Sequence, residues 1–261
     1  MRVSIVIPAY NEERRIGKTL EEYVRFFKYL KKDKILDFEI IIVINNTRDR
    51  TEEIVLSSCK KNQEVRCLNF REGGKGFAIV EGFKDALKRD NDLIGFVDAD
   101  MATPPEAFYD LVRSVNKYDG IIASRWLKKS IVKTRQSILR RVLSRGFNFL
   151  VRALFSMPYI DTQCGAKLFT KKTVEKIIGE IGITKWAFDV NLLYICRKKH
   201  LKIMEIPTIW EDKKDSKLDV TKVPIQMFSG IIRLRLINSP FNFVVRAYDK
   251  VPEIIKLHHK L

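Results

Sequence analysis

Cysteine and histidine are scarce in this sequence. Its 261 residues include four cysteines and three histidines. Because no two cysteines are spaced as a CxxC pair, neither a zinc site nor a disulfide framework is expected. The thiols are predicted to be buried or free, and they belong to Cys59, Cys67, Cys164 and Cys196.

Long apolar runs are absent as well. The longest stretches without a charged residue are ten residues, at 223–232 and 236–245, about half of what a membrane-spanning helix needs. Met1 leads straight into an apolar run, without the apolar core and cleavage site of a signal peptide. We therefore expect a chain that stays in the cytoplasm and reaches a membrane only peripherally.

Acidic residues are too few to balance the basic ones. The chain carries 49 Lys and Arg against 32 Asp and Glu, a formal net charge of +17. Such a balance implies an anionic partner, which is a nucleic acid, an acidic membrane surface or a phosphorylated substrate. The asymmetry is sharpest at 125–160, where nine basic residues occur and no acidic one.

Apolar residues recur among these arginines with roughly helical spacing. They are Ile138, Leu139, Val142, Leu143, Phe147, Phe149, Leu150, Val151, Leu154 and Phe155. The pattern predicts a basic amphipathic helix, which either packs on the domain as an ordinary surface helix or lies on an anionic membrane. Apolar segments with scattered basic residues at 223–235 and 241–257 favour the membrane. Nucleic acid is not expected, because no recognised binding motif is found.

The first hundred residues alternate between short apolar runs and amphipathic segments. This order predicts a mostly parallel central sheet with helices on both faces, the three-layer α/β class. The predicted strands cover 2–7, 38–44, 64–69 and 93–97, and the predicted helices cover about 12–31, 49–60 and 75–88. Amphipathic helices are expected after this core, at the C-terminal end of the chain.

Two carboxylates follow the apolar run at 93–97 directly. Asp98 and Asp100 lie two residues apart, a spacing at which an extended backbone points both side chains the same way. Hard cations such as Mg²⁺ take carboxylate oxygens together with substrate phosphates, so the pair predicts a metal-bound diphosphate. The alternative is a turn that only precedes a helix starting near Pro104.

Other polar clusters follow the predicted strands at the edge where open α/β sheets bind ligands. They are Pro8 to Glu12 and Asn45 to Thr47, and the turn Gly73 to Gly76 opens a predicted helix. The glycines allow close backbone approach, and Lys75 offers a cation to phosphate. Neither a Walker loop nor a GxGxxG fingerprint is present, and a glycine-rich turn by itself is more often a plain loop.

Several short motifs, in this order along the chain, resemble those of family 2 glycosyltransferases with the GT-A fold, and most closely the dolichyl-phosphate sugar synthases. The carriers are Pro8-Ala9-Tyr10-Asn11-Glu12-Glu13, Gly74-Lys75-Gly76, Asp98-Ala99-Asp100 with Thr103-Pro104, Ser124-Arg125-Trp126, Leu143-Ser144-Arg145-Gly146-Phe147-Asn148, Asp161-Thr162-Gln163-Cys164-Gly165-Ala166-Lys167 and Trp186-Ala187-Phe188-Asp189-Val190. Each motif alone is weak, whereas the ordered set spans nearly the whole chain.

The resemblance implies a metal-dependent, inverting transfer of a hexose from a UDP or GDP sugar to a polyprenyl (dolichyl) phosphate at the cytoplasmic membrane face. The metal is expected to be Mg²⁺ or Mn²⁺. The runs at 161–165 and 186–189 are more similar to glucosyl than to mannosyl transferases, so UDP-glucose is the expected donor. The alternatives are GDP-mannose, an acceptor sugar hydroxyl, or a non-catalytic scaffold that binds sugar nucleotide and membrane.

The resemblance also implies roles for individual residues. The donor-binding set is Pro8, Tyr10, Asn11, Glu12, Asn45, Lys75 and Asp98; the metal ligands are Asp98 and Asp100; the acceptor-binding set is Arg125, Arg140, Ser144, Gln163 and Lys167; and the catalytic residues are Asp100 and Asp189. One departure concerns Asn45-Asn46-Thr47, where the family usually has a longer run that contains carboxylates.

The acceptor decides whether a general base is needed. A phosphate monoester is largely ionised at neutral pH and needs positioning rather than deprotonation. A sugar hydroxyl needs a base, for which Asp189 is the candidate, although Asp189 equally suits the N-cap of a helix that runs to Lys199.

The chain is expected to divide by task. Residues 1–125 form the nucleotide-sugar part and residues 126–212 the acceptor part of one GT-A domain. Residues 213–261 form a loop and membrane-associating helices, and the loop at 213–219 is interpreted as a lid over the donor or as a plain exposed loop.

Overall fold

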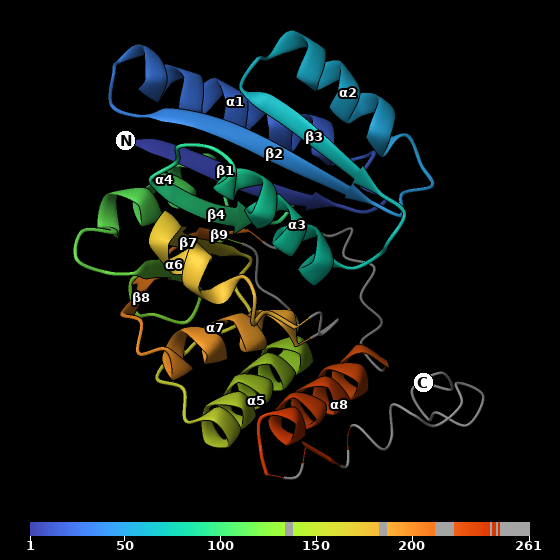
Figure 1. Cartoon of the computed structure of the whole chain (residues 1–261), viewed down its shortest axis with the longest axis vertical. Helices are drawn as coiled ribbons and strands as arrows, with labels where there is room; N and C mark the ends of the chain where they lie inside the picture. Colours follow the sequence, from blue (N-terminus) through green and yellow to red (C-terminus); the bar gives the residue numbers. More distant parts are fainter. Residues whose placement is uncertain (134–137, 183–186, 212–221, 241, 244, 246–261) are drawn as a thin grey trace.

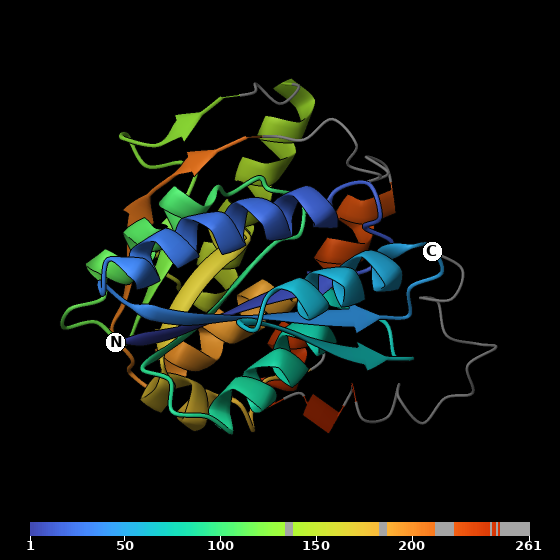
Figure 2. The same cartoon turned by 90° about the horizontal axis from the view of Figure 1, so that it is seen from above.

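The computed structural model describes residues 1–133, 138–182, 187–211, 222–240, 242–243 and 245. A seven-stranded sheet forms its centre, with helices on both faces (Figures 1 and 2). The strands are β1 (Arg2–Ala9), β2 (Asp37–Asn45), β3 (Val65–Phe70), β4 (Leu93–Val97), β5 (Gly120–Ser124), β7 (Ala166–Thr170) and β8 (Ile203–Pro207). Two short strands, β6 (Ile131–Val132) and β9 (Ile209–Trp210), pair with each other beside this sheet.

Eight helices lie within the described ranges. They are α1 (Ile16–Lys32), α2 (Thr51–Lys61), α3 (Lys75–Leu87), α4 (Pro105–Ser114), α5 (Ile138–Phe155), α6 (Lys171–Ile177), α7 (Phe188–Lys198) and α8 (Lys222–Ile237). None of the helices that can be described is long and apolar enough to cross a membrane. The predicted three-layer α/β class and the predicted N-terminal strands and helices are confirmed.

The strand order β3-β2-β1-β4-β7-β5-β8 creates a topological switch point between β1 and β4. From β1 the chain moves outward through β2 to β3, and α3 then carries it back across to β4 on the other side of β1. Ligands of open α/β sheets bind at such a point, outside the carboxyl ends of the strands. The residues after β1 and β4 therefore flank the natural crevice.

β7 is the one strand of the seven that runs against the others. It pairs antiparallel with both β4 and β5, and Ala166 lies opposite Val97. Because β7 enters the sheet at the edge where β4 leaves it, the residues just before β7 meet the residues just after β4. This reversal, which the alternating pattern of the first hundred residues did not predict, brings 161–165 to the crevice.

Each face of the sheet is covered by its own apolar core. The inner strands β1, β2 and β4 are buried on both faces, and β1 and β2 are rich in isoleucine and valine, as expected when helices cover both sides. One core joins the sheet to α1, α2 and α4 around Phe27, Phe38 and Phe108. The other joins it to α3, α6 and α7 around Phe83 and Phe96.

A third apolar cluster holds α5 and α8 against α7 and reaches Ile122 of β5 (Figure 1). Val151 and Phe155 of α5 meet Ile231 and Leu234 of α8, and all four side chains are buried. The predicted amphipathic helix at 138–155 is therefore present. Not all apolar side chains of this helix pack in the cluster, because Phe149 stays 73% exposed.

One predicted helix start differs from the structure, and two predicted segments lie wholly or mostly outside the described residues. The first helix was predicted from about residue 12 but begins at Ile16, because 12–15 form a turn in which the Glu12 carbonyl accepts from the N–H groups of Arg15 and Ile16. The loop at 213–219 lies outside the described residues, as does most of 241–257.

Candidate functional site

The carboxyl ends of β1 and β2 are tied together by short polar side chains. Asn11 sits in the left-handed region with φ 52°, and its carboxamide oxygen accepts from Arg48 N–H at 2.9 Å. Its own N–H donates to Thr47 Oγ1 at 3.2 Å. This leaves Tyr10 at the rim of the crevice with half of its surface exposed. An exposed aromatic ring on a fixed turn is suited to stacking on a nucleotide base.

Asn45 lies inside this framework rather than on its surface. Only 2% of it is exposed. With its amide oriented to satisfy both groups, it donates to the Ala9 carbonyl and accepts from Gly74 N–H, each at 3.0 Å. Asn45 therefore holds the glycine-rich turn against β1, and these contacts use the amide of a residue that was predicted to bind the donor.

The glycine-rich turn opens α3 and delivers Lys75 to the crevice. Gly74 precedes the helix with φ 126°, a conformation that glycine adopts without strain. Lys75 Nζ lies 2.6 Å from Asp98 Oδ1 and 3.9 Å from Asp189 Oδ2. Burial alone lowers the pKa of Lys75, but the Asp98 and Asp189 carboxylates outweigh it, so the pKa is raised and the amine stays charged.

A second lysine, which is fully buried, continues this line of charges. Lys167 of β7 is fully buried, and its Nζ donates to Asp189 at 2.6 Å and to the Cys164 carbonyl at 2.7 Å. The ring of Phe96 lies under both lysines, with 5.7 Å from Lys75 Nζ and 5.4 Å from Lys167 Nζ to its centroid. Asp98, Lys75, Asp189 and Lys167 thus alternate in sign across the bottom of the site.

Asp189 is an inward-facing carboxylate in the first turn of α7. The N-cap position belongs to Ala187, so the interpretation of Asp189 as the N-cap is wrong. Burial alone raises the pKa of Asp189, but the positive charges of Lys167 and Lys75 outweigh it, and the pKa lies below its ordinary value. A carboxylate held by two lysines is a weak general base.

Gly165 is the residue that lets Asp98 take its place. A Cβ at position 165 would lie 1.8 Å from Asp98 Oδ2, inside any permitted contact distance. The reversed strand β7 puts the backbone of Gly165 directly beside this carboxylate. Glycine is therefore required here by close approach, a reason that the sequence alone did not reveal.

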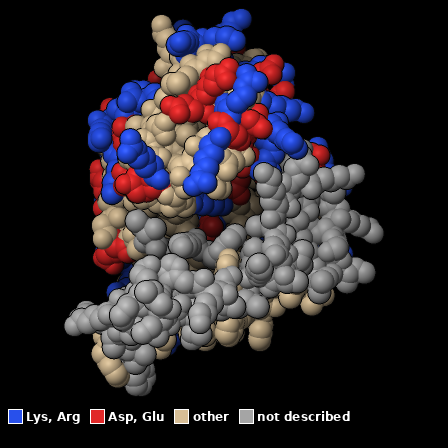
Figure 3. All heavy atoms as spheres, turned by 90° about the vertical axis from the view of Figure 1, so that its right-hand side faces the viewer, with Lys and Arg blue, Asp and Glu red and all other residues tan. Residues whose placement is uncertain are grey.

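The carboxylates beside the switch point are Glu12, Asp98 and Asp100. Burial raises the pKa of Glu12, Arg15 opposes this shift, and the negative charges of Asp100 and Asp98 add to it. Asp100 Oδ1 accepts from Ala102 N–H at 2.9 Å. Asp100 therefore also closes a turn, as the alternative interpretation of this motif expected. Figure 3 looks onto this edge, where basic side chains lie around a hollow that contains acidic ones.

These oxygens suit a hard divalent cation that completes its coordination with a ligand. Within the described ranges, no group of three His, Cys, Asp or Glu side chains is arranged to hold a metal ion by itself. Asp98 and Asp100 offer carboxylate oxygens, and Mg²⁺ or Mn²⁺ bound at such a pair takes further oxygens from a diphosphate and water. A cavity of about 460 Å³ lies beside Asp100, lined in part by Arg14, Lys18 and Lys133.

Arg125, at the end of β5, is fixed by a buried ion pair. Its Nε and Nη2 donate to the two oxygens of Asp161 at 2.7 and 2.9 Å, and its backbone N–H donates to the same carboxylate. Burial alone raises the pKa of Asp161, but Arg125 outweighs it and the pKa is lowered. The partner of Arg125 was not identified from the sequence, because the two residues lie 36 positions apart.

The other predicted acceptor residues are Arg140 and Ser144 on α5, Gln163 on the loop before β7, and Lys167 in β7 itself. Ser144 is half-buried, and its carbonyl accepts from the Asn148 side chain at 3.0 Å. Asn148 Oδ1 in turn accepts from the N–H and the hydroxyl of Thr162, which ties α5 to this loop. The side chain of Arg140 lies outside the described residues. Lys167 lies deeper than expected, among Asp189 and the other buried charges.

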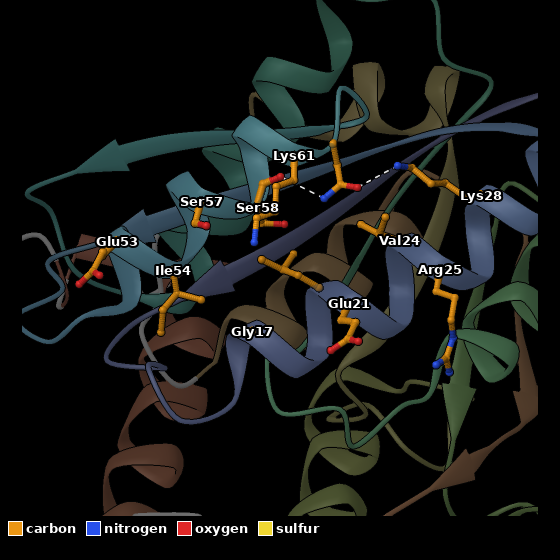
Figure 4. Close-up of a pocket in the computed structure, with 12 residues that line it drawn as sticks. Gly17, Glu21, Val24, Arg25, Lys28, Glu53, Ile54, Ser57, Ser58 and Lys61 are labelled. Atoms are coloured by element: carbon orange, nitrogen blue, oxygen red, sulfur yellow. Dashed lines mark hydrogen bonds between the residues drawn. The ribbon is translucent and has the colours of Figure 1, made fainter.

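A second cavity lies elsewhere, between α1 and α2 on the outer surface (Figure 4). Its volume is about 640 Å³, and residues such as Lys28, Ser58 and Lys61 line it. None of the predicted site residues belongs to it. The candidate functional site is therefore the crevice at the strand ends and not this second cavity.

Comparison with known proteins bears on this arrangement. The profile described as Glycosyl transferase family 2 matches residues 4–178. Dolichyl-phosphate beta-glucosyltransferase of Dictyostelium discoideum is 35% identical over 243 residues, which are 89% of this chain and 73% of that protein. The protein of the same name from Homo sapiens is 32% identical over 247 residues, which are 90% of this chain and 75% of that protein.

Among solved structures, the chain is similar to glucosyl-3-phosphoglycerate synthase from Mycobacterium tuberculosis in complex with Mn²⁺, UDP and glucosyl-3-phosphoglycerate. The TM-score is 0.66 at 16% identity, over 89% of this chain and 79% of that one. At this level of identity the likeness concerns the fold. It confirms the predicted GT-A architecture.

Proposed function

The chain belongs to glycosyltransferase family 2, and from this premise we propose that it transfers glucose from UDP-glucose to a dolichyl or related polyprenyl phosphate. The two relatives above are named for transfer of glucose to dolichyl phosphate, and each is matched over about three quarters of its length. The solved neighbour was crystallised with UDP and Mn²⁺. That the sugar is glucose and the nucleotide is UDP is inferred from these proteins and is part of the proposal.

The donor binds at the switch point in this account. Tyr10 lies at the rim for the base, and Pro8, Asn11 and Glu12 shape the turn beside it. Lys75, already charged, moves from Asp98 toward the diphosphate when the donor arrives. Since Lys75 lies on the first turn of α3, the positive end of that helix adds to the attraction.

Breaking the bond between sugar and diphosphate requires stabilisation of the charge that develops on the leaving group. Asp98 and Asp100 would hold a divalent cation, which supplies Lewis acid stabilisation of the leaving phosphate. Lys75 adds a second positive charge from the protein itself. The displacement is direct and inverts the anomeric centre.

The pairing of Asp189 is the observation that favours a phosphate acceptor over a sugar hydroxyl. A hydroxyl acceptor needs a general base, and Asp189 was the candidate. Its oxygens instead lie 2.6 Å from Lys167 Nζ and 3.9 Å from Lys75 Nζ, and its pKa is lowered. A phosphate monoester is already ionised and needs positioning, for which Arg140 and Ser144 are the proposed residues. Arg125 was also expected to bind the acceptor, but its guanidinium is held by both oxygens of Asp161.

The outer face of α5 and α8 supplies the proposed contact with the membrane. Phe149 is 73% exposed and Phe228 is 49% exposed, and Val142 and Ile237 extend the apolar surface. The exposed Arg145 lies on the same helix as Phe149. Each basic residue near an anionic leaflet contributes about 1 kcal/mol, so this face suits peripheral docking at the cytoplasmic surface.

One transfer assay distinguishes the proposed function from two others, a mannosyl transferase and a non-catalytic scaffold. The chain is incubated with polyprenyl phosphate, Mn²⁺ and radiolabelled UDP-glucose or GDP-mannose, and label is measured in the lipid extract. We expect lipid label from UDP-glucose and none with Asp100→Ala. Label from GDP-mannose alone would identify a mannosyl transferase. Binding of UDP-glucose without transfer to any acceptor would identify the non-catalytic scaffold.

A further inference from the structure

Three buried polar side-chain atoms near the Arg125–Asp161 ion pair have no hydrogen-bond partner among the residues that the structure describes. They are Ser124 Oγ, Trp126 Nε1 and Gln163 Nε2. Buried polar groups are nearly always hydrogen-bonded, so an unpartnered one calls for an absent water, ion or ligand. Finding three on two short segments of one site points to a ligand there.

The Arg125–Asp161 pair holds both segments in place. The backbone N–H groups of Arg125 and Gln163 donate to the Asp161 carboxylate, at 3.0 and 3.3 Å. The indole of Trp126 is fixed in turn, because the guanidinium groups of Arg125 and Arg145 lie over it at 5.8 and 5.1 Å from the ring centroid. The indole N–H of Trp126 is therefore presented from a rigid position, and the backbone that carries the Gln163 amide is held in place beside it.

These groups lie next to the place proposed for the diphosphate. Gln163 precedes Gly165 by two residues, and Gly165 touches the Asp98 carboxylate. Arg125 directly precedes Trp126 in the chain and is joined to the Gln163 segment through Asp161. A group attached to the diphosphate at Asp98 would extend into this neighbourhood.

The chemistry of the unpartnered atoms favours a neutral ligand rich in oxygen. The indole N–H of Trp126 can only donate, and so can the amide nitrogen of Gln163. Of the two guanidinium groups beside them, that of Arg125 is balanced by Asp161, which binds it bidentately, and that of Arg145 lies over the ring of Trp126. Neutral donors around a balanced ion pair suit hydroxyl oxygens of a sugar better than a second phosphate.

We propose that Trp126 and Gln163 bind hydroxyl groups of the hexose that is transferred, and that they thereby select the sugar. This inference rests on the proposed function, because it takes the donor to be UDP-glucose. Ser124 Oγ can donate or accept, so it does not decide between ligands. The indole of Trp126 and the backbone of Gln163 are held by protein contacts before any sugar arrives, which favours selective recognition.

The test compares binding of UDP-glucose with binding of UDP by calorimetry in the presence of Mn²⁺. Trp126→Phe keeps the ring and removes the N–H, and Gln163→Met keeps the size and removes the amide. We expect each variant to bind UDP-glucose about 5- to 10-fold more weakly, the size of one hydrogen bond, with affinity for UDP unchanged. Trp210→Phe, whose indole also lies against Arg125 at 5.2 Å, is the matched control and should bind both ligands normally.

Several results would contradict the inference. Equal loss for UDP and UDP-glucose would assign these residues to the nucleotide or to folding. Unchanged binding of UDP-glucose with a raised KM for polyprenyl phosphate would assign them to the acceptor. If Trp126→Phe does not fold, Gln163→Met decides alone. Failure of the wild-type chain to transfer glucose would instead overturn the proposed function.

Discussion

The region before Arg125 and the region after it use their side chains in different ways. Before Arg125, β1 to β4 and α1 to α4 supply most of one apolar core and, together with β7, α6 and α7, a second one, and they leave a small polar crevice at the strand ends. After it, α5 and α8 pack on α7 but keep phenylalanines on their outer face. The first region is built to enclose a small charged ligand, and the second to meet an extended apolar surface.

The two regions are joined by paired charges as well as by apolar packing. Lys75 comes from the first region, whereas Asp189 and Lys167 come from the second. The catalytic crevice therefore exists only where both regions are folded. Changes at this junction should have larger effects than changes on either side.

Asp189→Asn tests the junction and should have the largest effect. It leaves the fully buried Lys167 without its anionic partner, so the free energy of unfolding should fall by about 3–5 kcal/mol. Because the pKa of Asp189 is lowered in the folded state, its contribution is complete above its ordinary value near 3.8 and is lost as the pH falls through the lowered value. The difference between wild type and variant should thus be constant from pH 5 to 8, as measured by urea unfolding.

The matched control for that variant is Asp110→Asn, which breaks an exposed ion pair with Arg113 on α4. Its cost should be about 0–1 kcal/mol. A cost as large as that of Asp189→Asn would show that the buried junction has no special role.

Lys75→Gln tests the first region alone. The substitution removes the positive charge that we assign to the leaving diphosphate, so the transfer rate should fall by about 10²–10³-fold. Lys84→Gln lies on the same helix, pairs only with Glu81 among its described neighbours, and should transfer glucose at the wild-type rate. Equal rates for the two variants in single-turnover assays would remove Lys75 from the chemistry.

Gly165→Ala probes how closely the second region approaches the first. The added Cβ would meet Asp98 Oδ2 at 1.8 Å, so Asp98 has to shift by about an ångström or more, and displacement of that size can cost about 10²-fold in rate. Gly179→Ala adds the same methyl group where no atom lies within 4 Å. It should leave kcat/KM unchanged, and a fully active Gly165→Ala would contradict the assigned position of Asp98.

Phe149→Ser tests the outer face of the second region and should have the smallest effect. A buried phenyl group contributes about 1.5–3 kcal/mol, so partitioning onto anionic vesicles should weaken by roughly 10-fold or more in a sedimentation assay. Tyr29→Ser removes an aromatic side chain from α1 that is 60% exposed and should not change partitioning. Similar losses for both variants would mean that α5 is not the docking face.

The sequence predicted the first region better than the second. Alternating apolar and amphipathic runs are local signals, and they located the N-terminal strands, their carboxyl ends and the motif around Asp98. The reversal of β7 is not a local signal, so the contact between Gly165 and Asp98 could not be anticipated. The partners of Arg125 and Lys167 were missed for the same reason, because pairing of distant charges depends on the sheet order.

Asp189 shows where a local rule misled. An aspartate near the start of a helix suggests an N-cap, but this helix begins one residue earlier and carries Asp189 inward, toward two lysines. The surrounding buried charges decide its orientation. Asn45 is a similar case, since its amide serves the backbone of β1 and the glycine-rich turn.

The division of labour between the two regions is tested most directly by transfer of glucose from UDP-glucose to two acceptors. One is a polyprenyl phosphate in anionic vesicles, and the other is a short-chain, water-soluble isoprenyl phosphate, each assayed with wild type and with the double variant Phe149→Ser, Phe228→Ser. The account predicts that the double variant loses transfer to vesicles but keeps transfer to the soluble phosphate. If the double variant lost transfer to both acceptors equally, or if the wild-type protein transferred glucose to neither, this division of labour would be contradicted.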